Sequence, residues 1–97
     1  MDPAEPITPR TRVVRADSPF SSRIEDETVI LSLETDNYYG FGSAGSRIWE
    51  LLAEPLEVRA LCDQLRKEYA VDQETCFRDT REFLEQLLRE KLIRLLD

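Results

Sequence analysis

The most informative absence in this chain of 97 residues is histidine, and cysteine is scarce as well. Without histidine, no side chain has an ordinary pKa close to neutrality, so the usual general base of an active site is missing. The two cysteines, Cys62 and Cys76, lie 14 positions apart, which does not match the close pairs that bind zinc. The sequence therefore predicts a protein that is not an enzyme and that holds neither a metal nor a cofactor.

Long apolar runs and an excess of basic charge are also absent. No apolar run reaches about 18 residues, the length that a membrane span requires, and no secretion signal opens the sequence. We therefore expect a cytoplasmic protein with no membrane partner and with two free thiols. Thirteen basic residues against twenty acidic ones give a net charge of −7. This charge repels phosphate and argues against nucleic acid as a partner.

Glycine and tryptophan are rare, and all of them fall in one segment. The three glycines are Gly40, Gly42 and Gly45, and the single tryptophan is Trp49. Residues 40–45 imitate the dinucleotide-binding pattern G-x-G-x-x-G, but no βαβ unit surrounds them, so we expect no nucleotide site. The segment instead indicates a corner at which a strand leads into a helix.

Proline divides the chain into two parts. Four of the five prolines lie within residues 1–19, which carry few apolar side chains. We interpret this part as a flexible, proline-rich N-terminal tail and residues 20–97 as one domain with a single core. Within the domain, strands are expected up to about residue 42 and helices beyond it.

The first part of the domain predicts an antiparallel meander of three strands, at about 20–25, 28–33 and 38–41. Asp26-Glu27 is the expected first turn, and residues 34–37 form the expected second turn. Because side chains alternate between the two faces of a strand, the pattern also predicts which of them are buried. The residues expected to face the core in the second strand are Val29, Leu31 and Leu33, with Ile30 on the opposite face. In the third strand, one face is expected to carry Tyr39 and Phe41 and the other Tyr38.

The second part predicts three helices. Ser43 is the candidate N-cap of the first helix, and Pro55 is expected to end it. Asp72 is the candidate N-cap of the third helix, which runs to about Arg89. The second helix carries a single apolar stripe, which consists of Val58, Leu61, Cys62, Leu65 and Tyr69.

The apolar surface of the third helix is wider than one packed face needs. Its residues form two adjoining stripes: Cys76, Thr80, Phe83 and Leu87 on one, and Phe77, Leu84 and Leu88 on the other. Two interpretations are open at this point. The helix either buries the whole surface between two other helices or leaves one edge of it for a partner.

An ordered set of motifs from about Phe20 to Leu96 resembles the PqqD-like family, and especially its stand-alone members in lasso-peptide pathways. The motifs that carry the resemblance are the Leu31 and Leu33 pair, Tyr38-Tyr39-Gly40, Gly45, the run from Ile48 to Leu52, and then Asp79, Phe83, Leu84 and Leu87. Two departures stand out. This chain has Phe41-Gly42 where the family usually has Leu-Asn, and Thr80 where it often has Val.

The resemblance implies an α+β, winged-helix-like fold in which a three-stranded antiparallel meander precedes three helices. It also implies a recognition element that binds the leader segment of a ribosomally made precursor peptide. The leader would add as a fourth antiparallel strand to the third strand, beside the third helix. The residues expected to bind the leader are Tyr38, Tyr39, Gly40, Phe41, Gly42, Cys76, Asp79, Thr80 and Phe83. An unpaired strand edge without proline or lysine agrees with this mode of binding.

The expected partners are the precursor leader and a leader peptidase or another peptide-modifying enzyme, with the protein itself a monomer or weak dimer. Three alternatives remain. The first is an adaptor for a radical-SAM peptide-modifying enzyme, and the second is a winged-helix DNA-binding regulator, which the negative charge disfavours. The third is a small structural subunit that dimerises through the same open strand edge.

Overall fold

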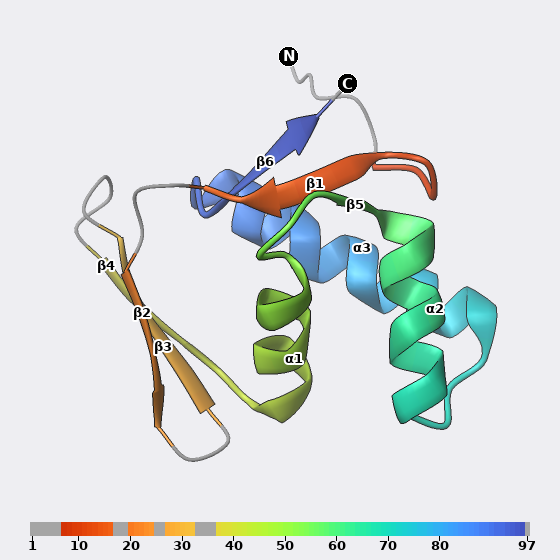
Figure 1. Cartoon of the computed structure of the whole chain (residues 1–97), viewed down its shortest axis with the longest axis horizontal. Coiled ribbons are helices and arrows are strands. Elements are labelled where there is room, and N and C mark those ends of the chain that lie inside the picture. Colours follow the sequence, from red (N-terminus) through yellow and green to blue (C-terminus); the bar gives the residue numbers. More distant parts are fainter. Residues whose placement is uncertain (1–6, 17–19, 25–26, 33–36, 97) are drawn as a thin grey trace.

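The computed structural model describes residues 7–16, 20–24, 27–32 and 37–96, and shows three helices and two small sheets (Figure 1). The architecture is α+β, as predicted. In chain order the elements are β1 (Arg12–Arg15), β2 (Phe20–Ile24), β3 (Glu27–Ser32), β4 (Asn37–Phe41), α1 (Ser43–Leu51), β5 (Leu56–Glu57), α2 (Val58–Glu68), α3 (Gln73–Arg89) and β6 (Ile93–Leu96). None of these helices is both long enough and apolar enough to cross a membrane.

The first predicted feature, the antiparallel meander, is confirmed as the sheet β2-β3-β4 with β3 in its centre. The predicted first turn is wrong by one residue. Glu27 already belongs to β3 and pairs with Ile24, so the connection consists of residues 25–26, which lie outside the described residues. Asn37 likewise belongs to β4 and pairs with Ser32, whereas residues 34–36 of the predicted second turn lie outside the described residues.

The predicted core face of β3 is also wrong. Thr28 and Ile30 are buried, and Ile30 is 0 % exposed, whereas Val29 is only half-buried. The reason is the position of α1, which lies against β3 and covers the face that Ile30 occupies. The sequence carries apolar residues on both faces of this strand, so counting them favoured the wrong face. Leu33, the third residue of the predicted set, lies outside the described residues.

A second sheet, β5-β1-β6, was not predicted. Residues 12–15 pair antiparallel with β6 at one edge and with β5 at the other. Val13 is 0 % exposed, and Ile7 is also buried in the core. The prediction of a flexible N-terminal tail is therefore wrong for residues 7–16, because apolar side chains among the prolines pack against the domain. Residues 1–6 and 17–19 of that tail lie outside the described residues.

The three helices follow the predicted stripes, with differences at their ends. The N-cap of α1 is Gly42, so Ser43 is the first residue of the helix and the predicted capping role is wrong. The prediction for α3 is confirmed, since the Asp72 carboxylate accepts a hydrogen bond from the Thr75 backbone N–H at 3.0 Å. In α2 the buried residues are Val58, Leu61, Cys62 and Leu65. The helix ends at Glu68, which leaves Tyr69 beyond it and exposed.

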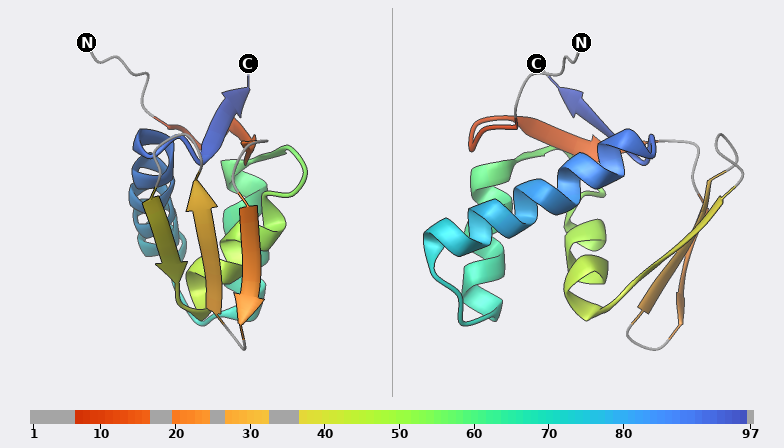
Figure 2. Two further views of the ribbon diagram at one scale, coloured as in Figure 1. Left: turned by 90° about the vertical axis from the view of Figure 1, so that its left-hand side faces the viewer. Right: turned by 180° about the vertical axis from the view of Figure 1, so that it is seen from behind.

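All three helices lie on one side of the sheet β2-β3-β4 (Figure 2). In the first panel of Figure 2 this sheet faces the viewer and the helices lie behind it. The sheet β5-β1-β6 lies across the C-terminal ends of α1 and α3. The chain passes from α3 into this sheet through Leu92 and Ile93, which are core residues. This layout leaves β4 at one edge of its sheet, next to α3.

Candidate peptide-binding groove

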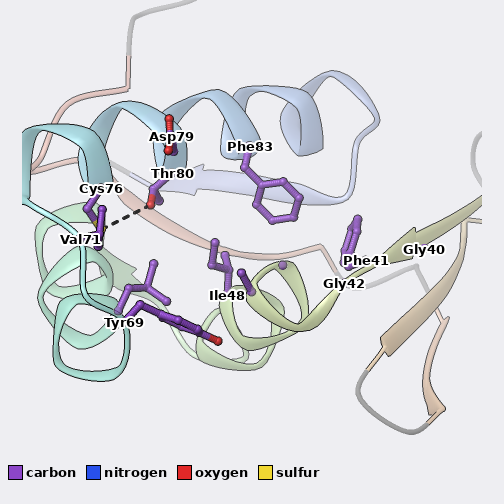
Figure 3. Close-up of a pocket in the computed structure, with 13 residues that line it drawn as sticks. Gly40, Phe41, Gly42, Ile48, Tyr69, Val71, Cys76, Asp79, Thr80 and Phe83 are labelled. Carbon is purple, nitrogen blue, oxygen red and sulfur yellow. Dashed lines mark hydrogen bonds between the residues drawn. The ribbon is translucent and has the colours of Figure 1, made fainter.

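A pocket of about 440 Å³ opens between the end of β4, the helices α1 and α3, and the connection from α2 to α3 (Figure 3). Its walls are predominantly apolar. The residues that line it are Gly40, Phe41, Gly42, Ala44, Gly45, Ile48, Leu65, Tyr69, Val71, Cys76, Asp79, Thr80 and Phe83. A volume of this size accommodates a bulky side chain of a ligand.

Seven of the nine residues predicted to bind a leader line this pocket. Gly40 and Phe41 come from the end of β4, Gly42 is the N-cap of α1, and the other four come from successive turns of α3. For Tyr38 and Tyr39 the structure describes the backbone, which pairs with Leu31 and Ile30 in the sheet. The structure therefore brings the predicted helix residues and the end of the predicted strand together at one place.

An aromatic corner fixes the end of β4 against the helices. The Phe41 and Phe83 rings meet edge to face with their centroids 5.1 Å apart, and the Phe41 ring lies 6.1 Å from that of Trp49. Gly45 makes this contact possible. A Cβ at position 45 would lie 3.1 Å from Phe41 Cβ and 3.2 Å from Phe83 Cζ, which is closer than ordinary packing allows. A side chain at this position of the first helical turn therefore requires a neighbouring ring to shift by a few tenths of an ångström.

The polar groups of the pocket are few. Thr80 and Cys76 are buried in its wall, with Cys76 Sγ 4.0 Å from Thr80 Oγ1. The Cys76 thiol also lies 3.8 Å from the Cys62 carbonyl oxygen, to which it donates. Both cysteines are free thiols, as predicted. Burial, reinforced by the neighbouring Cys76 thiol, raises the pKa of Cys62 to about 11, so this thiol is unreactive near neutral pH.

Asp79 supplies a carboxylate at the exposed mouth of the pocket, 3.4 Å from Arg78 Nε. None of the lining residues that the structure describes is basic or a histidine, the residue types that would work with this carboxylate in acid–base chemistry. Among the described residues, no group of three or more His, Cys, Asp or Glu side chains could hold a metal ion. The inventory of the pocket suits binding of an apolar group.

The pocket continues along α3 as a groove. A second hollow of about 350 Å³ adjoins it on the other side of Phe41 and Phe83, and it is lined further along α3 by Gln86, Leu87 and Glu90. Gly40 lines both hollows, so the end of β4 forms one side of the groove and α3 forms the other. Within the described residues β4 pairs only with β3. Its second edge therefore offers unpaired backbone groups to an extended chain.

Six lining residues were not predicted to belong to the site: Ala44, Gly45, Ile48, Leu65, Tyr69 and Val71. Three of them lie in α1 and one in α2, where they follow the same apolar stripes as the core residues. Periodicity does not distinguish a buried side chain from one that borders a cavity. Signals existed for Gly45 and Ile48, which belong to the motifs of the family resemblance, and for Tyr69, because a large aromatic residue at the very end of a helical stripe has little helix left to pack against.

Comparison with known proteins agrees with this geometry. A solved structure described as TbiB1 in complex with the TbiA(beta) leader peptide superimposes with a TM-score of 0.79 and 40 % sequence identity. The match covers 84 % of this chain and 94 % of that one. None of the curated protein sequences matches the chain significantly. The family model described as coenzyme PQQ synthesis protein D (PqqD) matches residues 27–93, more than half of the chain. The chain belongs to the PqqD family.

Proposed function

We propose that this protein captures the leader segment of a ribosomally made precursor peptide and presents it to an enzyme of lasso-peptide biosynthesis in the cytoplasm. The observation that carries the proposal is the unpaired edge of β4 beside an apolar groove along α3. The similar TbiB1 structure contains a leader peptide, which supports the same class of ligand here. The protein acts by binding and performs no catalysis itself.

The leader adds to β4 as a fourth antiparallel strand, because every pairing in the sheet β2-β3-β4 is antiparallel. Main-chain hydrogen bonds to the edge of β4 supply sequence-independent affinity, and the pocket supplies the selection of one side chain. An aromatic or proline side chain suits the apolar walls of the pocket. Phe83 and Thr80 contact it from α3, and Asp79 at the mouth favours a leader with basic residues nearby.

The outer face of the sheet provides a place for the processing enzyme. No helix covers the face opposite to buried Ile30 within the part of the chain that the structure describes (Figure 2). The strand register aligns Phe20, Leu31 and Tyr38 in one row across the three strands, at positions that alternate with Ile30 and its partners. A leader bound at the edge of β4 would extend this sheet, so an enzyme on its outer face would meet protein and leader together.

Titration with the leader of the precursor encoded beside this gene tests the proposal. Trp49 is buried against Phe41, so its fluorescence is a built-in reporter of changes at the pocket. Ala44 is exposed and lines the pocket, so Ala44→Phe places a ring in its mouth with little cost to folding. We expect this variant to bind the leader at least about tenfold more weakly than the unchanged protein.

Ala60→Phe is the matched control, because Ala60 is also exposed on a helix but is not among the residues that line the pocket. Its affinity for the leader should equal that of the unchanged protein. Absence of saturable leader binding by the unchanged protein contradicts the proposed function. A dimer that dissociates as leader is added would show that the same edge also joins two copies of the chain.

A further inference from the structure

Among the residues whose side chains the structure describes, Tyr69 is the one exposed large apolar residue, with 39 % of its surface accessible. It also lines the pocket, together with Val71 from the same connection between α2 and α3. The remaining large apolar residues of the pocket are buried or half-buried. Figure 3 shows Tyr69 across the pocket from Phe83 and Asp79, on the wall that α3 does not supply.

The backbone of Tyr69 is held although its ring is exposed. Its N–H donates to the Leu65 carbonyl at 2.8 Å, and its dihedral angles, φ −128° and ψ 143°, end the helix in an extended conformation. The chain therefore leaves α2 at this residue and carries the ring over the pocket mouth. An exposed aromatic ring on a fixed backbone can turn toward a ligand at a small entropic cost, since it has only two side-chain torsions.

The residue before Tyr69 is tied to α1. Arg47 Nε donates to both carboxylate oxygens of Glu68 at 3.0 Å, and the Arg47 Nη2 atom lies 2.9 Å from Glu68 Oε2. Gln64 adds a hydrogen bond of 2.7 Å to the same carboxylate, and Arg47 also donates to Glu50 at 3.1 Å. This network joins α1, which supplies one wall of the pocket, to the end of α2, which carries Tyr69.

We propose that Tyr69 is a specificity-determining residue that covers the leader side chain entering the pocket, and that the Arg47–Glu68 pair positions it. The inference rests on the proposed function and adds a residue outside the predicted site. The chemistry that fits is a bulky apolar or aromatic side chain, enclosed between Tyr69 on one side and Phe83 on the other. Tyrosine is among the residue types that most often dominate binding energy when they become buried at an interface.

Three variants of the full-length protein test this assignment with a synthetic leader peptide as the probe. Tyr69→Ala is expected to weaken leader binding about tenfold, whereas Tyr69→Phe keeps the ring and should retain most of the affinity. Lys67→Ala is the matched control, because Lys67 is exposed on the last turn of α2 and does not line the pocket. Its affinity for the leader should not change.

A double-mutant cycle separates a contact from an indirect effect. The leader is substituted by alanine at each position of its docking segment, and each peptide is titrated against the unchanged protein and Tyr69→Ala. Coupling is expected at one leader position, the one whose side chain enters the pocket. Equal weakening at every position would show that Tyr69 acts only through the fold and would overturn the assignment. Hydroxyl-radical footprinting should also show Tyr69 protected once leader is bound.

The positioning role of the ion pair has its own readout. Arg47→Met keeps an apolar stem but removes the bonds to Glu68, so leader binding should weaken about two- to fivefold, with most of this loss absent in the Tyr69→Ala background. The inference would be overturned if Arg47→Met and Tyr69→Ala both kept the leader affinity while Ala44→Phe lost it. The proposed function would then still stand. Failure of the unchanged protein to bind leader would instead refute the proposed function.

Discussion

The two sheets of this protein each have three strands but differ in how those strands are connected. In the sheet β5-β1-β6 the central strand comes from the start of the described chain and one neighbour from its end. In the sheet β2-β3-β4 all three strands are consecutive, and two connections of a few residues join them. The first sheet closes the domain, whereas the second leaves one edge beside a groove.

From this difference we expect one sheet to contribute mainly to stability and the other mainly to leader binding. Val13 in the centre of the closing sheet is 0 % exposed, and the C-terminal strand is joined to it by a full antiparallel register from Arg12 to Arg15. The edge strand β4, by contrast, has a half-buried Phe41 and an exposed Gly40 at the end that borders the groove. Substitutions in the first sheet should therefore affect folding, and substitutions in the second should affect the ligand.

The largest expected effect comes from the same change made in each sheet. Val13→Asp would bury an unpaired carboxylate, which costs about 3–5 kcal/mol of the free energy of unfolding. Val29→Asp, at a half-buried position of the other sheet, should cost less than half as much. Urea unfolding followed by circular dichroism measures both. Equal losses would mean that the two sheets contribute alike to the stability of the domain.

The two sheets also differ in how far each could be predicted from the sequence. The local meander and the three helical stripes follow from alternation and periodicity, and Asp72 caps α3 as its residue type indicates. The closing sheet could not be inferred in this way. β1 and β6 are separated by most of the chain, and four-residue strands carry too little pattern to show their pairing. Prolines beside β1 suggested a tail, although Val13 is a core residue.

The candidate site shows the same division between local and tertiary information. The helix residues Cys76, Asp79, Thr80 and Phe83 share one stripe, so periodicity and family resemblance together could group them. The opposite wall, with Tyr69 and Val71, comes from the connection that follows α2, where Glu68 bonds to Arg47 of α1. The buried face of β3 could not be predicted from the sequence either, since it depends on where α1 lies.

The second expected effect contrasts the two edges of the open sheet. Proline substituted singly at positions 38–41 of β4 should divide the variants into two alternating sets, because strand amides point alternately to the two sides. One set loses backbone bonds to the leader, each worth about 1 kcal/mol and supplemented by a steric clash, so affinity falls at least about tenfold. The other set loses bonds to β3 and should lose stability instead.

The same scan along β2, at positions 21–24, serves as the control. β2 is the other edge of the sheet, so proline at its outward amides should leave both the fold and leader affinity unchanged. Hydrogen exchange checks the result independently, since leader should protect alternate amides of β4 and none of β2. If leader protects no amide of β4, the peptide docks elsewhere and the proposed strand addition is wrong.

A third effect, smaller in stability than in affinity, is expected at the junction between the open sheet and the helices. Gly45→Ala adds a Cβ 3.2 Å from the end of the Phe83 ring, which must move toward the pocket, and 3.1 Å from Phe41 Cβ. Alanine gains roughly 1 kcal/mol in helix propensity over glycine, which offsets the crowding. We expect nearly unchanged unfolding and leader binding weakened about fivefold, as measured by denaturation and calorimetry. Unchanged affinity with lowered stability would show that Phe41 moves instead and that the pocket keeps its shape.

The smallest expected effect lies behind the pocket, where burial raises the pKa of Cys62 to about 11. A raised pKa means that the folded protein holds the proton more tightly than the unfolded chain does. The tighter binding of this proton stabilises the folded protein. The stabilisation is complete below the ordinary thiol pKa of about 9 and is lost as pH rises from there to about 11. At pH 10 the loss is about 1 kcal/mol.

Tyrosine and lysine titrate in the same range, so the test compares how the free energy of unfolding depends on pH in the unchanged protein and in two variants. In Cys62→Ala the free energy of unfolding should decline less steeply from pH 8.5 to about 10.5 than in the unchanged protein. In Cys76→Ala the decline should be intermediate, because Cys76 adds to the pKa shift of Cys62 without being its main cause. Equal slopes in all three proteins would show that the Cys62 thiol titrates alike in the folded and unfolded chains, and that burial between α2 and α3 does not raise its pKa.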